Sequence, residues 1–240
     1  MIAAQKHGVE RIVYTGSISA MYNFREIPQV INETHWNDLT LPKLSAYDVS
    51  KTLAELAAWD FIKEIKDGEH KPELVSILPG FTTGKIIGKG ASSSVDIIKF
   101  LMRGAMSKVP RLEMKCVDVH DVAQAHVRSL FIPEAAGHRF ILVDRPVWLQ
   151  EIAQTLAEHY DGKEQPKLPI PTKEYSLIEM WIGSWFSAPA AAAYSYWNKQ
   201  HNFDTSPSKI ILGIEYARHP KECFLETAND FITSGAVRIN

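Results

Sequence analysis

Residues 45–80, SAYDVSKTLAELAAWDFIKEIKDGEHKPELVSILPG, contain the two patterns that decide the fold. Ser45 is a good helix cap, and apolar side chains recur after it at near-helical spacing as far as about Lys66. The run Glu73–Leu78 is short, apolar and rich in β-forming residues, and Pro79-Gly80 ends it. The stretch therefore predicts a long helix followed by a buried strand.

The same alternation extends to both sides of this stretch. Upstream, we expect the end of a helix stopped at Gly8 and then a buried strand over Arg11–Gly16. Downstream, helices and strands are expected in turn at Val95–Arg103, Met114–Val119, from His120, Phe140–Val143 and Trp148–Tyr160. Strands that alternate with helices predict an α/β fold with a parallel sheet and crossover helices. The last third of the chain is expected to be mostly helical.

An aromatic segment, Tyr175–Trp197, lies in this last third and contains Trp181, Trp185, Phe186 and Trp197. Such side chains either line an apolar pocket or fill the core, and burial of large aromatic surface is the commoner outcome. We therefore expect core packing.

Composition excludes several functions. The formal net charge of -2 and the absence of a basic run argue against a nucleic-acid partner. No apolar stretch reaches the roughly 18 residues that span a bilayer, and no secretory signal is recognisable, so we expect a cytoplasmic protein. Cys116 and Cys223 are expected to be buried thiols. His120 and His126 lack ligand spacing, so no metal site is expected.

Candidate chemistry centres on Tyr47 and Lys51, because a four-residue separation places them on one face of the predicted helix. A free phenol, with a pKa of about 10, is a poor acid near neutrality, but a neighbouring ammonium group stabilises the phenolate. Carbonyl reduction needs such a proton donor together with a group that orients the substrate oxygen. Ser17, at the exit of the first strand, is the candidate for that second role, with Thr15 and Ser19 as alternatives.

Motifs in the same order resemble the extended short-chain dehydrogenase/reductases, and most closely the branch of the dihydroflavonol and cinnamoyl-CoA reductases. They comprise Val13-Tyr14-Thr15-Gly16-Ser17, Ala46-Tyr47-Asp48-Val49-Ser50-Lys51 with Ala54-Glu55, Leu78-Pro79-Gly80-Phe81-Thr82-Thr83-Gly84, and Val117-Asp118-Val119-His120-Asp121-Val122-Ala123. A later segment, Phe203-Asp204-Thr205-Ser206 with Glu226-Thr227, is similar to the end of the family's chains. The resemblance covers nearly the whole sequence.

The resemblance implies a Rossmann-like, doubly wound parallel sheet with a small, mostly helical C-terminal substrate lobe. Residues 1–147 would form a partial dinucleotide-binding and catalytic domain, and residues 148–240 mostly the substrate lobe, with interleaved segments. It also implies NADP(H), or else NAD(H), as cofactor. The partner would be a small apolar carbonyl or alcohol, and a homodimer is compatible with the sequence.

The family likeness also assigns roles to individual residues. Tyr47 would be the general acid, Lys51 would hold the nicotinamide ribose, and Ser17 would bind the substrate oxygen. The loop after the strand would lie against the nicotinamide carboxamide, and its residues are Pro79, Gly80, Phe81 and Thr82.

One expected feature is not found in the sequence. A glycine-rich turn that receives the pyrophosphate should precede these motifs, yet Gly8 and Gly16 fit no such frame. We therefore expect the N-terminal strands to be absent, the strand at Arg11 to have an unpaired edge, and activity to depend on a missing segment. The alternatives are a hydroxysteroid dehydrogenase/isomerase, a sugar-nucleotide epimerase, and a catalytically dead binding module.

Overall fold

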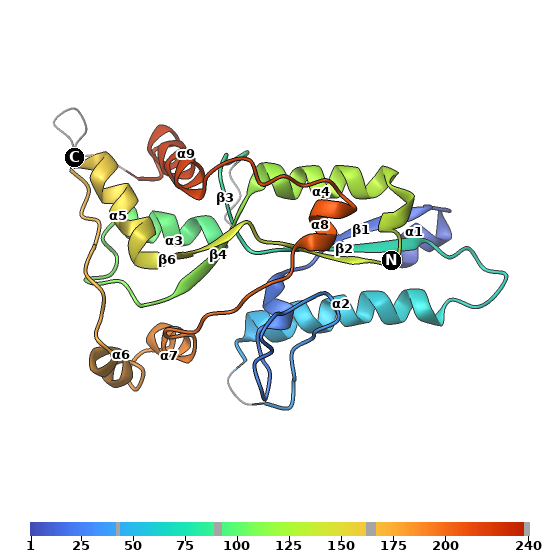
Figure 1. The fold of residues 1–240 in the computed structure, drawn as a ribbon, viewed down its shortest axis with the longest axis horizontal. Helices are drawn as coiled ribbons and strands as arrows, with labels where there is room; N and C mark the ends of the chain where they lie inside the picture. Colours follow the sequence, from blue (N-terminus) through green and yellow to red (C-terminus); the bar gives the residue numbers. More distant parts are fainter. Residues whose placement is uncertain (42–43, 89–92, 162–166, 238–240) are drawn as a thin grey trace. The chain divides into compact units, whose positions relative to one another are not determined.

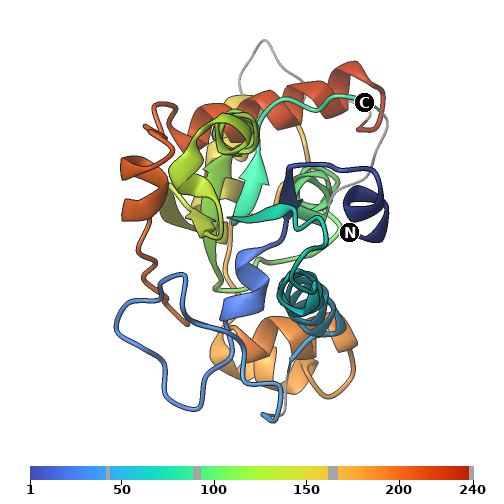
Figure 2. The same ribbon diagram turned by 90° about the vertical axis from the view of Figure 1, so that its right-hand side faces the viewer.

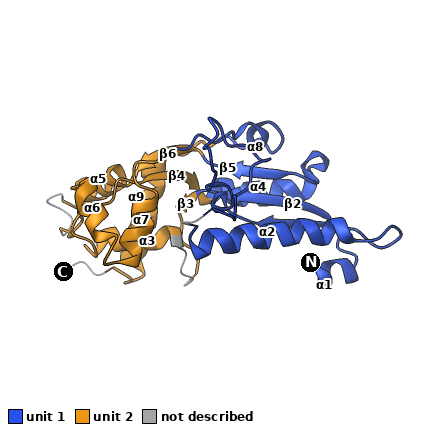
Figure 3. Ribbon diagram, turned by 90° about the horizontal axis from the view of Figure 1, so that it is seen from below, with its two compact units in different colours: residues 1–80, 120–143, 201–215 blue, residues 81–119, 144–200, 216–240 orange. Residues whose placement is uncertain are grey.

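Two compact units make up the structure, a computed structural model that describes residues 1–41, 44–88, 93–161 and 167–237. Each unit is assembled from three segments of the chain (Figure 3). The first contains residues 1–80, 120–143 and 201–215, and the second contains residues 81–119, 144–200 and 216–240. The predicted division between residues 147 and 148, with its two functional roles, stays a prediction.

A parallel sheet with the strand order β1-β2-β5 organises the first unit. Helices α2 and α4 lie on opposite faces of this sheet (Figure 1), which is the doubly wound arrangement that the sequence predicts. The elements of this unit are α1 (Ile2–Lys6), β1 (Arg11–Thr15), the 3-10 helix η1 (Ile18–Met21), α2 (Ala46–Glu64), β2 (Glu73–Pro79), α4 (Val119–Phe131), the 3-10 helix η2 (Pro133–Ala135), β5 (Arg139–Leu142) and α8 (Ser206–Ile210).

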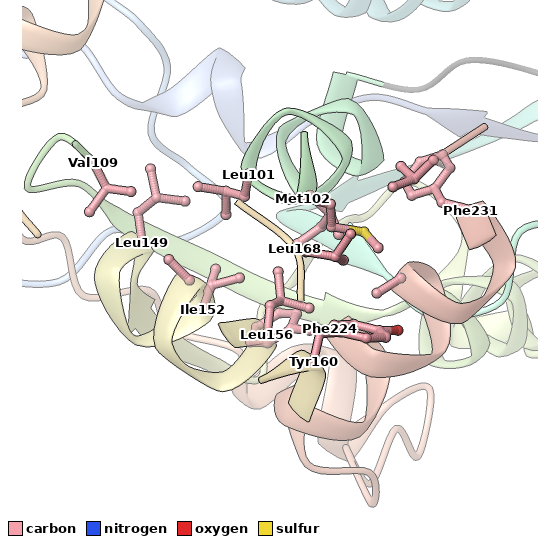
Figure 4. Close-up of a cluster of buried hydrophobic side chains, with 14 of the residues drawn as sticks. Leu101, Met102, Val109, Leu149, Ile152, Leu156, Tyr160, Leu168, Phe224 and Phe231 are labelled. Atoms are coloured by element: carbon pink, nitrogen blue, oxygen red, sulfur yellow. The ribbon is translucent and has the colours of Figure 1, made fainter. Parts of the chain in front are cut away.

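A smaller mixed sheet lies in the second unit, where β3 pairs with β4 in parallel and β6 pairs with β4 antiparallel. Its elements are β3 (Phe81–Thr83), α3 (Ser93–Met102), β4 (Glu113–Asp118), β6 (Arg145–Trp148), α5 (Leu149–Tyr160), α6 (Leu177–Gly183), α7 (Ala188–Ser195) and α9 (Pro220–Thr233). Figure 4 shows the core of this unit, in which α3, α5 and α9 contribute Leu101, Leu156 and Phe224, all without exposed surface.

The predicted α/β fold with a parallel sheet is confirmed, and the helices and strands expected from periodicity are present. The burial of Cys116 and Cys223 is confirmed as well. Burial raises the pKa of the Cys223 thiol to about 12, so this thiol stays protonated at neutral pH. No helix among the described residues combines the length and apolar composition that a membrane crossing requires.

The expectation that the aromatic segment packs into the core is wrong. Trp181 is 44% exposed, Trp185 is 68% exposed and Phe186 is 83% exposed. The two tryptophan rings contact each other edge to face, with their centroids 4.7 Å apart. Met180 is the one buried residue of α6, so this short helix turns little of its apolar surface to the core.

Candidate active site

The start of α2 is fixed by hydrogen bonds within its own first turn. The Ser45 hydroxyl accepts a hydrogen bond from the Asp48 amide at 3.1 Å, and the Asp48 carboxylate accepts one from the Ser45 amide at 3.1 Å. This reciprocal capping box satisfies two backbone donors at the helix end. Tyr47 lies within this capped turn, so the backbone that carries its phenol is well defined.

Tyr47 and Lys51 lie next to each other on α2, as the four-residue spacing predicts. The Lys51 ammonium nitrogen is 5.8 Å from the centroid of the Tyr47 ring. Tyr47 is 46% exposed, so a ligand can reach its side chain. Within this distance the ammonium group is attracted to the electron-rich ring face.

Tyr14, on β1, has electrostatic contacts with Tyr47 and with Glu55 of α2. Burial raises the pKa of Tyr14 above its usual value, and the charges of Glu55 and Tyr47 raise it further. Tyr14 therefore stays a neutral phenol near the candidate pair.

Ser17 lies two residues after the end of β1 and caps the 3-10 helix η1. Its hydroxyl oxygen accepts a hydrogen bond from the Ser19 amide at 3.1 Å, and the residue is 8% exposed. That bond uses the hydroxyl as an acceptor and leaves its proton able to point to another oxygen. η1 packs directly against α2, which Figure 2 shows nearly end-on, so Ser17 precedes a segment in contact with the helix of Tyr47.

Pro79 and Gly80 end β2, the strand next to β1. The Gly16 amide donates to the Ile77 carbonyl at 2.8 Å, and the Gly80 amide donates to the Leu142 carbonyl at 3.0 Å. Ser17 and Gly80 thus lie just after adjacent parallel strands at the carboxyl edge of the sheet, where open α/β sheets bind ligands.

Phe81 and Thr82, the other two predicted loop residues, belong to the second unit, where they form part of β3. Phe81 is 7% exposed and its side chain belongs to the core of that unit. β3 pairs with Cys116 and Val117 of β4. Only the backbone of Phe81 is therefore suited to a role in binding.

A buried ion pair that the sequence did not reveal holds α2 against the sheet of the first unit. Glu55 has no exposed surface, and its carboxylate accepts hydrogen bonds from the Arg139 guanidinium at 2.8 and 3.0 Å and from the Ser76 hydroxyl at 2.6 Å. Glu55 appeared in the sequence only as part of a motif. Its partner Arg139 lies 84 residues away, and no local pattern could have paired them.

Two curated relatives are similar to this chain in sequence. The NADPH-dependent methylglyoxal reductase GRE2 of Saccharomyces cerevisiae is 31% identical over 238 residues, which is 93% of this chain and 64% of that protein. Cinnamoyl-CoA reductase 2 of Arabidopsis thaliana is 33% identical over 176 residues, which is 71% of this chain and 49% of that protein.

In sequence and in fold the chain is similar to the extended short-chain dehydrogenase/reductases. Within that family the similar proteins include cinnamoyl-CoA reductases, as the motifs predict. The crystal structure of the yeast methylglyoxal/isovaleraldehyde reductase Gre2 complexed with NADPH matches with a TM-score of 0.71 and 27% identity, over 95% of this chain and 66% of that one. No family model matches the chain.

The chain spans about half to two thirds of the length of the relatives it matches. The roles of Ser17, Tyr47 and Lys51 therefore stay predictions. The geometry of the first unit gives the positions of these three residues.

Proposed function

We propose that the protein reduces a ketone or aldehyde to an alcohol, or catalyses the reverse reaction, with NADP(H) as cofactor and Ser17, Tyr47 and Lys51 as the chemical residues. The observation that carries the proposal is the Lys51 ammonium 5.8 Å from the ring of the exposed Tyr47. The relatives named NADPH-dependent methylglyoxal reductase and cinnamoyl-CoA reductase support this choice of reaction and cofactor.

The donor set at the start of α2 fits the ribose end of a nicotinamide dinucleotide. Lys51 offers three N–H donors and Tyr47 one O–H group, and both are at least partly exposed on one helix face. Adjacent hydroxyl groups of a ribose are suitable acceptors for them. The sequence contains no glycine-rich frame of the dinucleotide-binding type, so no residue is assigned to the pyrophosphate.

Each residue has a distinct task in the proposed reaction. A bound nicotinamide supplies the hydride that reduces the carbonyl carbon. Tyr47 gives a proton to the carbonyl oxygen, and the Lys51 cation stabilises the phenolate that remains. The Ser17 hydroxyl donates a hydrogen bond to the same oxygen and orients the substrate. The backbone at Pro79 and Gly80, at the carboxyl edge of the sheet, would border the nicotinamide.

The substrate class is a small, apolar carbonyl compound. Methylglyoxal and isovaleraldehyde, named for the yeast relative, are small carbonyl compounds, and cinnamoyl-CoA is a larger thioester. NAD(H) is the alternative cofactor, because the residue that distinguishes the two ribose forms is not among those identified.

The test is NADPH consumption by the purified 240-residue chain with methylglyoxal, isovaleraldehyde and cinnamoyl-CoA as substrates. We expect turnover with at least one of them and a loss of about 100-fold or more in Tyr47→Phe, because the variant keeps the ring but lacks the proton. The melting temperature of the variant controls for folding. Cofactor binding without turnover would favour a catalytically dead module, and product formation without net NADPH consumption would favour an epimerase or isomerase.

A further inference from the structure

We infer that Asn37 is a positioning residue, which couples the segment after Ser17 to the helix that carries Tyr47 and Lys51. The catalytic consequence of this coupling rests on the proposed function, whereas the coupling itself does not. Asn37 lies in the long irregular segment between η1 and α2 and belongs to none of the sequence motifs.

The Asn37 side-chain amide is 7% exposed and makes four hydrogen bonds. Its nitrogen donates to the Ser19 carbonyl at 2.8 Å and to the Thr52 hydroxyl at 2.8 Å. Its oxygen accepts from the Tyr22 amide at 2.6 Å and from the Asn23 amide at 2.7 Å. The two donors and both lone-pair positions of the amide are thus occupied.

The orientation of this amide is fixed by its partners. The two backbone amides can only donate, so they require the oxygen. The Ser19 carbonyl can only accept, and the Thr52 hydroxyl donates its proton to the Asp48 carbonyl at 2.7 Å, so both require the nitrogen. If the amide oxygen and nitrogen were exchanged, the nitrogen would face two N–H donors and the oxygen would face two acceptors.

One NH2 group therefore joins the two candidate catalytic segments. Ser19 belongs to η1, which Ser17 caps. Thr52 follows Lys51 and bonds to Asp48, which follows Tyr47. Thr52 has no exposed surface, so water cannot replace a lost bond there, and a buried unsatisfied group results.

A second set of contacts holds the segment that contains Asn37 in place. The Arg139 guanidinium donates to the carbonyls of Glu33 at 2.6 Å and of His35 at 2.8 Å, and its central carbon is 3.6 Å from the centroid of the Trp36 ring. Because Arg139 is also bound to Glu55 of α2, residues 33–37 are tied to that helix at two places. Asn37 acts as the fixed point between η1 and the first turns of α2.

Two variants test the coupling, and each has a matched control. Asn37→Asp puts an oxygen in place of the donor that spans both segments, and Thr52→Val removes the hydroxyl with little change of shape. Thr52→Ser keeps the hydroxyl. Asn23→Ala removes a hydrogen bond to the Asp38 carbonyl, 3.1 Å long, that lies within the segment and does not reach α2.

Amide hydrogen exchange of the full chain measures the coupling without any need for activity. In Asn37→Asp and Thr52→Val we expect exchange to rise about 10-fold both in residues 18–23 and at the start of α2. Asn23→Ala should affect residues 18–23 alone, and Thr52→Ser should resemble the parent chain. If either test variant fails to fold, the other decides. Faster exchange in only one of the two segments would overturn the inference.

Steady-state kinetics measures the consequence for the site. We expect Asn37→Asp and Thr52→Val to lower kcat about 10- to 100-fold at an unchanged KM for NADPH, with recovery in Thr52→Ser. An unchanged kcat in variants with altered exchange would show that Asn37 is merely structural. A folded parent chain without turnover would contradict the proposed function and leave the exchange result as the measure of coupling.

Discussion

At the residue scale, the buried charges around Glu55 are compensated almost completely. Its carboxylate accepts hydrogen bonds from two nitrogens of the Arg139 guanidinium and from the Ser76 hydroxyl. The guanidinium also lies over the Trp36 ring. A buried ion pair of this kind contributes modestly to stability while intact, but removal of one partner leaves an uncompensated charge. The pair therefore fixes α2 against β5 more than it strengthens the core.

We expect Glu55→Gln to lower the free energy of unfolding by about 3 kcal/mol, because Arg139 would keep its charge in a buried place. Urea denaturation monitored by circular dichroism measures the change. Glu73→Gln is the matched control, since the Arg11–Glu73 pair is half exposed on the carboxylate side, at 50%. Its loss should be below about 1 kcal/mol. Equal losses in the two variants would refute the importance of burial.

Residue identities at the site were predictable to different degrees. Tyr47 and Lys51 could be found because their spacing is local and belongs to one helix. Asn37 and Arg139 could not, because their partners lie in other elements and a single polar residue in an irregular segment carries no periodic signal.

At the scale of elements, length decides what the sequence reveals. α2, with 19 residues and a capping box, and β2, with seven mostly buried residues, were both predictable. β3 was not, because three residues are too few for a recognisable alternation, and β6 was not, because it contains a proline and no buried residue. Polar contacts, rather than an apolar face, hold the short helix α6 in place.

One of these contacts predicts a pH dependence. Glu179 caps α6 and accepts a hydrogen bond from the Lys108 ammonium at 2.5 Å, and this bond is the main reason that its pKa is lowered to about 2 from 4.5. A carboxyl whose folded pKa is depressed contributes stability above its unfolded pKa and loses it as the pH falls through the folded value.

We therefore expect Glu179→Gln to speed amide exchange in α6 near neutral pH. The difference from the parent chain should shrink as the pH falls from about 4.5 towards about 2. NMR titration of the carboxyl carbon supplies the second readout, and its midpoint should rise in Lys108→Met. A midpoint that stays the same in Lys108→Met would show that the ion pair does not set the titration.

At the scale of the whole molecule, the sequence predicted the class of fold but not the distribution of apolar surface. β1 lies at an edge of the described sheet, as expected, and an apolar groove of about 750 Å³ runs beside it, lined by residues including Ile12, Ala57 and Phe61. The exposed aromatic residues of α6 and the following turn were expected in the core instead. Which face of a short helix meets the core depends on tertiary contacts that a sequence does not state.

As a whole, the molecule is proposed to be a reductase in which Tyr47 and Lys51 form the cofactor-binding and proton-donating pair. The decisive experiment is a fluorescence titration of NADPH into the folded chain, with Lys51→Met compared with Lys63→Met, an exposed lysine near the end of the same helix. We expect saturable binding that Lys51→Met weakens at least about 10-fold and Lys63→Met leaves unchanged. Equal affinities in the two variants, or no binding by the folded parent chain, would contradict it.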